Sequence, residues 1–389
     1  MVVPEPFFQP RGTPFSVLHR LKALSSFGHY IDLITYHIGE DIPIKNIHIH
    51  RTINIPFIRH VDIGPSFKKI LCDIFLLLKT IRFLTARKYD VLHTHEEAGF
   101  IAAVLKLFFN IPHIYDMHSS LPQQLKNFDK GNLRPLVRLF EWLEKKTLDS
   151  ADGIITICED LQNHVKDVAP HRSPVLIENV GDNSTIFEDL GAIEVQKKYR
   201  IPKQKSIILY TGTFEKYQGI ELLIHSAVSL LKKDRDALYL LVGGKSHQIR
   251  KMKLLANSLG IGDKVIFTGT VHPREIKYFY GISDIIASPR IQGTNSPLKI
   301  YSYLRSGIPI VATDLYTHRQ ILNENVAVLV EPDPEKFANG ISNLLGDEMM
   351  RERIVLQAKK LAEKKYSYRD YLEKTKSVYE NIQSNYTKT

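Results

Sequence analysis

The amino-acid sequence predicts an α/β protein made of two Rossmann-like, doubly wound domains. Short β-branched runs alternate with longer helical patterns along nearly the whole chain, which is typical of βαβ units and parallel sheets. The alternation stops near residues 179–189, a polar stretch with glycine and no periodicity, and then starts again. A length of 389 residues also fits two domains better than one.

The first half carries six complete strand patterns, and Met1 to Val3 have the character of the tail of a strand before them. These strands are expected at residues 30–36, 47–53, 91–95, 113–117, 153–157 and 174–177. Helices are expected between them at residues 14–27, 66–87, 99–109, 133–148 and 159–168. The chain begins abruptly, which leaves open whether a start lies upstream.

The second half repeats the pattern. Strands are expected at residues 206–210, 238–242, 264–268, 284–287, 308–312 and 327–330. Helices are expected at residues 219–232, 246–259, 273–280, 296–305 and 335–345. A long charged helix follows from about residue 347 to the end, with a break near residues 366–368.

The composition is that of a soluble globular protein, with 43% hydrophobic and 24% charged residues. The two cysteines, Cys72 and Cys158, have no metal-ligand spacing and make no disulfide framework, so a reduced, cytoplasmic location is expected. The first residues, MVVPEPFFQPRG, lack a basic segment and a continuous apolar run, so no secretory signal is expected.

The net charge of +10 is concentrated in the second half. Residues 1–180 contribute 21 − 19 = +2 and the remainder 31 − 23 = +8. An anionic ligand in the second half is therefore expected. Nucleic acid is disfavoured as a partner, because the lysines are dispersed and no zinc-finger, homeodomain or RNP pattern is present.

One apolar stretch raises the question of a membrane. Residues 67–86, FKKILCDIFLLLKTIRFLTA, are interrupted by five charged residues and do not predict a membrane span. A basic amphipathic helix can lie on anionic lipid, so a peripheral contact with the inner face of the membrane stays open. An ordinary helix packed on a sheet, with its lysines solvated, is the favoured interpretation.

In the first half, polar side chains follow the predicted strands. Gly12, after the first strand and before a helix opened by Pro14, lets backbone N–H groups approach a phosphate or a sugar hydroxyl. His95 and His118 end two strands, and Asp116 is placed to orient or charge His118. His93 is expected to be structural. The full GxGxxG fingerprint is absent, which disfavours a nicotinamide cofactor.

In the second half, residues 210–219, YTGTFEKYQG, form a strand, a glycine turn and a helix start, which is an anion site with Thr213 and Lys216 as further contacts. LVGGK (residues 241–245) is another such turn, and VIFTGTV, with Gly269, offers backbone groups to a flat base. In ASPRIQGTNSPLKIYSYLRSG (residues 287–307), a helix is expected to begin near Ser296, with Arg290 beside its N-terminus.

The order of PRG, DVLHTH, YDMH, TGTFEKYQG, FTGTV, NSPLKIYSYLRSGIPIVATD and VEPDPEKFANGI resembles glycosyltransferase family 4 of the GT-B fold, over nearly the whole chain. The resemblance implies two domains facing each other across a cleft. An acceptor-side domain would comprise residues 1–180 and a final helix, 367–389, that packs back on it. A domain of residues 181–366 would bind the nucleotide sugar.

The resemblance also implies the chemistry. A sugar would pass from a nucleotide-diphosphate-sugar to an acceptor hydroxyl, usually with retention and without a metal or other cofactor. His118 matches the histidine that contacts the donor sugar, and it is the predicted catalytic residue. The basic apolar stretch at residues 67–86, rather than the resemblance, favours a glycan or a lipid-linked molecule as the acceptor. The predicted donor-binding residues are Gly12, Thr13, Gly212, Thr213, Lys216, Gln218, Gly269, Arg290, Thr294, Ser296, Pro297, Leu298, Lys299 and Ser302.

The chain departs from the family pattern at four of these positions. The usual pair of glutamates falls at Thr294 and Ser302, and the usual arginine and lysine of the diphosphate turn fall at Thr213 and Gln218. Arg290, Lys216 or Lys299 would then supply the missing charge. Two alternatives stay open: a catalytically inactive GT-B scaffold or sugar-binding protein, and a GT-B epimerase acting on a sugar nucleotide. Donor sugar, base and acceptor are left open.

Overall fold

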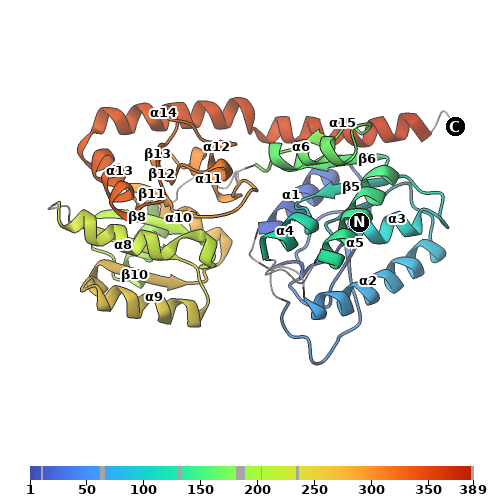
Figure 1. The fold of residues 1–389 in the computed structure, drawn as a ribbon, viewed down its shortest axis with the longest axis horizontal. Coiled ribbons are helices and arrows are strands. Elements are labelled where there is room, and N and C mark those ends of the chain that lie inside the picture. Colours follow the sequence, from blue (N-terminus) through green and yellow to red (C-terminus); the bar gives the residue numbers. More distant parts are fainter. Residues whose placement is uncertain are drawn as a thin grey trace. The chain divides into compact units, whose positions relative to one another are not determined.

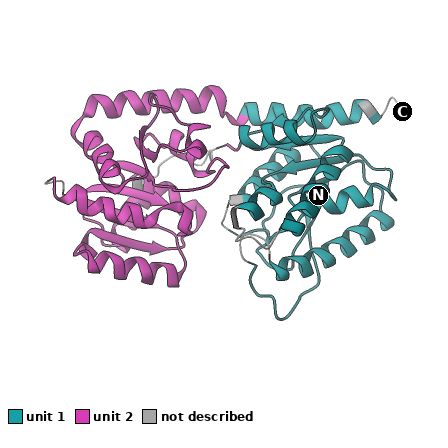
Figure 2. Ribbon diagram, in the orientation of Figure 1, with its two compact units in different colours: residues 1–178, 369–389 teal, residues 179–368 magenta. Residues whose placement is uncertain are grey.

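The computed structural model describes residues 1–9, 12–61, 66–128, 134–180, 189–202, 204–233 and 236–386. The chain divides into two compact units, one of residues 1–178 and 369–389 (unit 1) and one of residues 179–368 (unit 2) (Figure 2). Of the predicted boundary stretch 179–189, residues 181–188 lie outside the described residues, as do Pro10 and Arg11 of the predicted first loop.

Unit 1 contains a seven-stranded parallel sheet in the order β3-β2-β1-β4-β5-β6-β7. The strands are β1 (Val2–Val3), β2 (Ile31–Thr35), β3 (Ile47–Arg51), β4 (Leu92–His95), β5 (His113–Met117), β6 (Gly153–Thr156) and β7 (Val175–Leu176). The chain order reverses between β1 and β4, so the carboxyl ends of β4 and β5 border the topological switch point where such sheets bind ligands.

Helices cover both faces of this sheet (Figure 1). They are α1 (Gly12–Ser26), α2 (Phe67–Ala86), α3 (Ala98–Leu105), α4 (Leu121–Phe128), α5 (Arg134–Ser150), α6 (Glu159–Val168) and α15 (Tyr368–Tyr386). The connections through α2, α3 and α5 all run in one direction along the sheet, whereas the connection through α1 runs in the other. Because βαβ crossovers are right-handed, α1 packs on the face opposite to α2, α3 and α5.

Unit 2 contains a six-stranded parallel sheet in the order β10-β9-β8-β11-β12-β13. The strands are β8 (Ser206–Thr211), β9 (Ala237–Val242), β10 (Val265–Gly269), β11 (Ile285–Ser288), β12 (Ile310–Thr313) and β13 (Val328–Val330). The central strands are continuous apolar runs such as ALYLLV in β9, all of it buried, as expected for a parallel sheet covered on both faces. Here the order reverses between β8 and β11.

The helical segments of unit 2 alternate with these strands. They are α7 (Asp189–Lys198), η1 (Lys216–Gln218), α8 (Ile220–Leu231), α9 (Ser246–Ser258), η2 (Gly262–Lys264), η3 (Pro273–Glu275), α10 (Ile276–Tyr280), α11 (Lys299–Arg305), α12 (Tyr316–Arg319), α13 (Pro334–Gly346) and α14 (Glu348–Lys365). None of the helices in the described part of the chain is long and apolar enough to cross a membrane.

Two helix predictions need correction. The helix expected at Ser296 begins at Lys299, because a residue before proline is disfavoured in the α conformation and Arg290 and Thr317 already engage the Asn295 carbonyl. The helix expected at residues 99–109 ends at Leu105, where tighter backbone bonds from Leu107 and Phe108 close it. The predicted break before the last helix is confirmed: α14 ends at Lys365 and α15 begins at Tyr368.

Candidate active site

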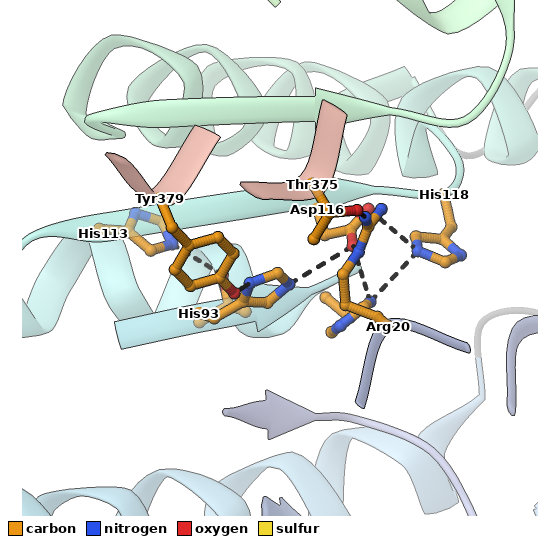
Figure 3. Close-up of polar contacts among 9 residues, drawn as sticks. Arg20, His93, His113, Asp116, His118, Thr375 and Tyr379 are labelled. Atoms are coloured by element: carbon orange, nitrogen blue, oxygen red, sulfur yellow. Dashed lines mark hydrogen bonds and ion pairs between the residues drawn. The ribbon is translucent and has the colours of Figure 1, made fainter. Parts of the chain in front are cut away.

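Unit 1 gathers histidines and an aspartate at the carboxyl ends of two neighbouring strands (Figure 3). His93 and His95 belong to β4, Asp116 belongs to β5, and His118 follows β5 directly. The register pairs His95 with Asp116, which brings the two side chains to the same edge of the sheet. All four side chains are buried; His95 is 0% exposed and His118 is 5% exposed.

Asp116 is the centre of this cluster. Its Oδ2 accepts a hydrogen bond from Arg20 Nε of α1 at 3.0 Å, and its Oδ1 lies 3.1 Å from His118 Nε2. His93 Nε2 lies 3.4 Å from Asp116 Oδ2, and His95 Nδ1 lies 3.2 Å from His118 Nε2. The carboxylate therefore holds His118 in one orientation, while Arg20 compensates its charge.

The charge state of the cluster follows from these contacts. Burial would raise the pKa of Asp116, but Arg20 and His118 outweigh it and hold that pKa well below its usual range. Burial would lower the pKa of His118, but the Asp116 carboxylate outweighs it and the pKa is raised. Burial lowers the pKa of His93 to about 4, despite Asp116. His118 is thus the histidine favoured to carry the positive charge.

The last helix of the chain supports this cluster from the α1 face. Tyr379 of α15 places its hydroxyl 2.6 Å from His93 Nδ1, and Thr375 Oγ1 accepts a hydrogen bond from Arg20 Nη1 at 2.6 Å. The Arg20 guanidinium also lies over the Tyr371 ring, 5.0 Å from its centroid. Two residues that contact Asp116 are therefore held by α15 (Figure 3).

Ligand atoms of His93, His95 and Asp116 lie within 4.8 Å of one another, which is a spacing that a metal ion can use. The charge of Arg20 argues against one, because its guanidinium already binds Asp116 Oδ2 and would repel a dication beside it. Hydrogen bonds and ion pairs thus explain the cluster better than metal coordination.

Glu96, directly after β4, has a left-handed backbone with φ of 48°, which is uncommon for a residue other than glycine. Its Oε2 accepts a hydrogen bond from Ser119 Oγ at 2.6 Å. Burial and the neighbouring Glu97 raise the pKa of Glu96. Strained backbone at a strand end, next to a histidine, is typical of functional loops.

The other predicted site residues of unit 1 lie at the start of α1. Gly12 is the first residue of α1, and Thr13 follows it, half-buried, in the first turn. The predicted approach of a ligand to this loop therefore falls at a helix N-terminus. His95, in contrast, is fully buried against His93 and His118, so its ring supports the cluster rather than facing solvent.

In unit 2, glycines end three neighbouring strands. A Cβ atom at Gly243 would lie 2.0 Å from the Gly212 carbonyl oxygen, and Gly243 N–H donates to the Gly269 carbonyl at 2.9 Å. Gly219, with φ of 72°, caps α8, and a Cβ atom there would lie 1.9 Å from the Pro289 carbonyl oxygen. Only glycine allows these approaches, which bring the turn after β8 against the loop after β11.

Lys299, the first residue of α11, reaches this turn. Its ammonium donates to the Thr211 carbonyl and to Gln218 Oε1, both at 3.2 Å, and lies 4.0 Å from the Tyr210 ring centroid. Tyr210 in turn donates from its hydroxyl to the Thr213 carbonyl at 2.7 Å. Loss of hydration lowers the pKa of Lys299 well below its usual value, and the charge of Arg290 adds to this.

Arg290 holds its own loop. Its Nε donates to the Gln292 carbonyl at 2.7 Å and its Nη1 to the Asn295 carbonyl at 3.0 Å, while the guanidinium lies 5.1 Å from the Tyr217 ring centroid. Burial lowers the pKa of Arg290. Arg290 is therefore both a cation of this region and the residue that shapes the loop before α11.

The remaining predicted residues surround this loop and turn. Ser296 Oγ is buried and, among the described residues, has no hydrogen-bond partner. Lys216 and Thr294 are exposed, and the Thr294 carbonyl accepts from Gln320 Nε2 at 2.5 Å. Pro297 is buried, whereas Gly269, Leu298 and Ser302 are half-buried. Gly212, Thr213, Gln218 and Lys299 thus come together, while Lys216 lies on the exposed side of the turn.

Sequence reasoning missed Arg20, Thr375 and Tyr379, although a signal was available for the first two. Arg20 lies on the buried stripe of α1 with Val17, Leu21 and Leu24, where a charged side chain requires a partner. Thr375 likewise shares the buried stripe of α15 with Tyr371 and Val378. A polar residue on an apolar helix stripe is the pattern that would have indicated Arg20 and Thr375, whereas Tyr379 carries no such signal.

Two family models match this chain, "Glycosyltransferase Family 4" over residues 10–179 and "Glycosyl transferases group 1" over residues 192–361. An uncharacterised glycosyltransferase of Methanocaldococcus jannaschii is 26% identical over 90% of both chains. The alpha-monoglucosyldiacylglycerol synthase of Streptococcus pneumoniae is 23% identical over 79% of this chain and 68% of its own. The structure of sucrose-phosphate synthase from Thermosynechococcus elongatus has a TM-score of 0.82 at 17% identity, covering 99% and 98% of the two chains.

The fold of the two sheets agrees with these matches. A seven-stranded and a six-stranded parallel sheet, each with helices on its faces, form the two Rossmann-like units of the GT-B fold. The family matches extend over both units and the named relatives are transferases. The chain therefore belongs to glycosyltransferase family 4 and is a glycosyltransferase enzyme.

Proposed function

We propose that the protein transfers a sugar from a nucleotide-diphosphate-sugar to an acceptor hydroxyl, with retention of anomeric configuration and without a divalent metal. The observation that carries this proposal is the pair of cations at the glycine turn of unit 2. Among the residues that the structure describes, neither Lys299 nor Arg290 forms an ion pair with a carboxylate. Half-buried cations without a carboxylate partner favour an anionic ligand, and a pyrophosphate fits.

The leaving diphosphate needs its developing charge stabilised. The turn after β8 offers backbone N–H groups and the N-terminus of α8, and Lys299 adds a positive charge beside Gly212. The buried Ser296 hydroxyl is a further hydrogen-bond donor in this region. These groups compensate for the arginine, lysine and glutamates that Thr213, Gln218, Thr294 and Ser302 replace.

His118 is proposed to position the donor sugar. Asp116 fixes the ring and raises its pKa, so the side chain is oriented and favoured in the charged form. We expect His118→Ala to lower the rate of transfer by about 100-fold or more while the protein stays folded. The measurement is sugar transfer together with circular dichroism and thermal unfolding, with His247→Ala, exposed on α9, as the matched control. Wild-type turnover in His118→Ala would remove His118 from the mechanism.

One set of experiments identifies the donor and tests the alternative that the protein is a catalytically inactive scaffold. A thermal-shift screen against nucleoside diphosphates and their sugars identifies the base and the sugar, since a ligand that binds the folded state raises Tm. Slow hydrolysis of the stabilising donor, with and without EDTA, then tests for metal-free chemistry, and NMR of the product gives the anomeric configuration. A donor that binds but is never hydrolysed or transferred would favour a catalytically inactive scaffold or sugar-binding protein.

The proposed acceptor is a lipid-linked molecule. A relative is named for synthesis of a glucosylated diacylglycerol, which supports a lipid-linked acceptor over a free glycan. A cytoplasmic protein with contact to the inner face of the membrane would suit such an acceptor. Comparing transfer to detergent-solubilised lipid extract with transfer to water-soluble glycans would separate the two acceptor classes.

A further inference from the structure

The outward face of α2 is apolar. Phe67, Ile70, Ile74 and Leu78 are spaced by three or four residues, so they lie along one side of the helix, and each is at least 49% exposed. The opposite side, with Cys72 and Leu76, is already buried in the core of unit 1. A helix that is apolar on both sides is normally covered on both, so this outward stripe requires a second apolar environment.

Further exposed apolar side chains belong to α3 and α5. At the end of α3, Val104, Leu107 and Phe108 are exposed, the last two by 79% and 77%. On α5, Leu136, Leu139 and Trp142, the single tryptophan of the chain, are also exposed. Exposed apolar side chains scattered singly are ordinary, whereas a set of this size marks an interaction surface.

These three helices lie side by side on one face of the unit 1 sheet. Contacts join α2 to α3 and α3 to α5, and an ion pair of 2.5 Å between Lys69 and Glu97 ties the first turns of α2 and α3 together. The handedness of the connections places all three on the face opposite to α1 (Figure 1). We call their outward side chains the α2–α3–α5 surface.

The charge of this surface is positive. Its exposed charged residues include Lys68 and Arg82 of α2 and Arg134, Arg138 and Lys146 of α5. The acids of the same helices have partners: Asp73 accepts a hydrogen bond from Tyr36, and Glu144 lies 2.6 Å from His164. Glu141 pairs with Lys126 of α4, and Asp149 pairs with Lys145. Aromatic and aliphatic side chains interleaved with lysine and arginine suit the headgroup region of an anionic bilayer.

We propose that the α2–α3–α5 surface docks unit 1 onto an anionic phospholipid bilayer, with Phe67, Phe108 and Trp142 among the inserted side chains. The charge distinguishes this occupant from a second copy of the chain, because two such surfaces face to face would repel each other. The docking does not depend on the proposed transfer reaction. Its use to reach a lipid-linked acceptor does rest on that proposed function.

Vesicle binding tests the docking without any donor or acceptor. The full chain is sedimented with vesicles of phosphatidylcholine alone and with vesicles in which about a third of the lipid is phosphatidylglycerol, which gives the surface a negative potential. We expect binding to the anionic vesicles and much weaker binding to the neutral ones. Ile74→Gln with Leu78→Gln should weaken binding about tenfold or more, because two inserted apolar side chains are lost.

The controls come from the same chain. Leu254→Gln with Leu356→Gln changes two exposed apolar residues of unit 2 and should leave vesicle binding unchanged. Arg138→Gln with Lys146→Gln should weaken binding to anionic vesicles by about fivefold per charge and flatten its salt dependence. Wild-type protein that stays in solution with both vesicles would overturn the proposal. So would a wild-type dimer that Ile74→Gln with Leu78→Gln converts to a monomer without any change in vesicle binding.

Discussion

The two units hold their buried cations in opposite ways. In unit 1, Arg20 binds the Asp116 carboxylate, and its pKa is raised. In unit 2, Lys299 and Arg290 contact carbonyl oxygens, an amide oxygen and aromatic rings, and the pKa of each is lowered by burial. Compensation inside the protein indicates a network that positions a residue. Under the proposed function, the missing compensation in unit 2 is supplied by the anionic donor.

This difference separates residues that orient a side chain, in unit 1, from residues proposed to bind the donor, in unit 2. The unit 1 network fixes His118 through Asp116, and none of its charges requires a ligand. The unit 2 cations lie beside the glycine turn after β8, where a Cβ atom at Gly219 or Gly243 would meet the protein's own backbone; under the proposed function this turn binds the diphosphate through its N–H groups. Mutations in the first region should therefore act mainly on stability and orientation, and mutations in the second mainly on donor affinity.

The largest expected effect is at Asp116. Asp116→Ala leaves Arg20 buried without its carboxylate, and we expect the free energy of unfolding to fall by about 3–5 kcal/mol. Urea unfolding followed by tryptophan fluorescence measures this, because the single tryptophan, Trp142, belongs to unit 1. Adding Arg20→Met to Asp116→Ala should recover part of the loss. Equal stability of Asp116→Ala and wild type would show that Arg20 is not compensated by Asp116.

The shifted pKa values of Asp116 and His118 make the stability of the protein depend on pH. The pKa of Asp116 is lowered in the folded state, so its stabilisation is present above the unfolded value of about 4 and is lost as the pH falls through the folded pKa. The pKa of His118 is raised, so its contribution is complete below about 6.5 and is lost as the pH rises through the folded pKa. Asp116→Asn should flatten both limbs of a plot of stability against pH, and an unchanged plot would contradict this assignment.

Much of this fold was predictable from the sequence, because short, continuous β-branched runs alternate with longer amphipathic helical patterns. All the strands predicted in full formed, with bounds shifted by a few residues, whereas α4, α7 and α12 were not predicted. The start of α11 was placed wrongly because it depends on Arg290, a contact that the spacing does not contain. Similarly, the spacing suggested that Asp116 could orient His118, but the partners Arg20 and Tyr379 come from helices distant in sequence.

A second, smaller effect is expected at Lys299. Lys299→Met removes a buried cation that has no carboxylate among the described residues, so we expect unchanged or higher stability without ligand. Loss of a charge-assisted contact should weaken binding of a nucleoside diphosphate about tenfold to 100-fold, as measured by calorimetry. Lys216→Met, in an exposed residue of the same turn, is the control and should change affinity far less.

The lowered pKa of Lys299 provides two further measurements that distinguish wild type from Lys299→Met: the pH dependence of stability and the proton uptake on ligand binding. Between the lowered folded pKa and the unfolded value near 10.4, the unfolded state binds more protons, so wild-type stability should rise with pH in that range. A bound diphosphate favours the charged ammonium and should draw a proton from the buffer. Calorimetry in two buffers of different ionisation enthalpy measures that uptake, which should disappear in Lys299→Met. Persistent uptake in the variant would assign the proton to another group.

The smallest effect is expected at Tyr379. A variant of this residue tests whether α15 affects His118 through His93 and Asp116. Tyr379→Phe removes one hydrogen bond to His93 and should lower stability by about 1 kcal/mol. If α15 positions His118 through His93 and Asp116, the variant should also shift the pH dependence of transfer, whereas Ser377→Ala, exposed on the same helix, should not. Lower stability with an unchanged pH profile would confine α15 to packing. A shift in both would make the last helix of the chain part of the apparatus that orients His118.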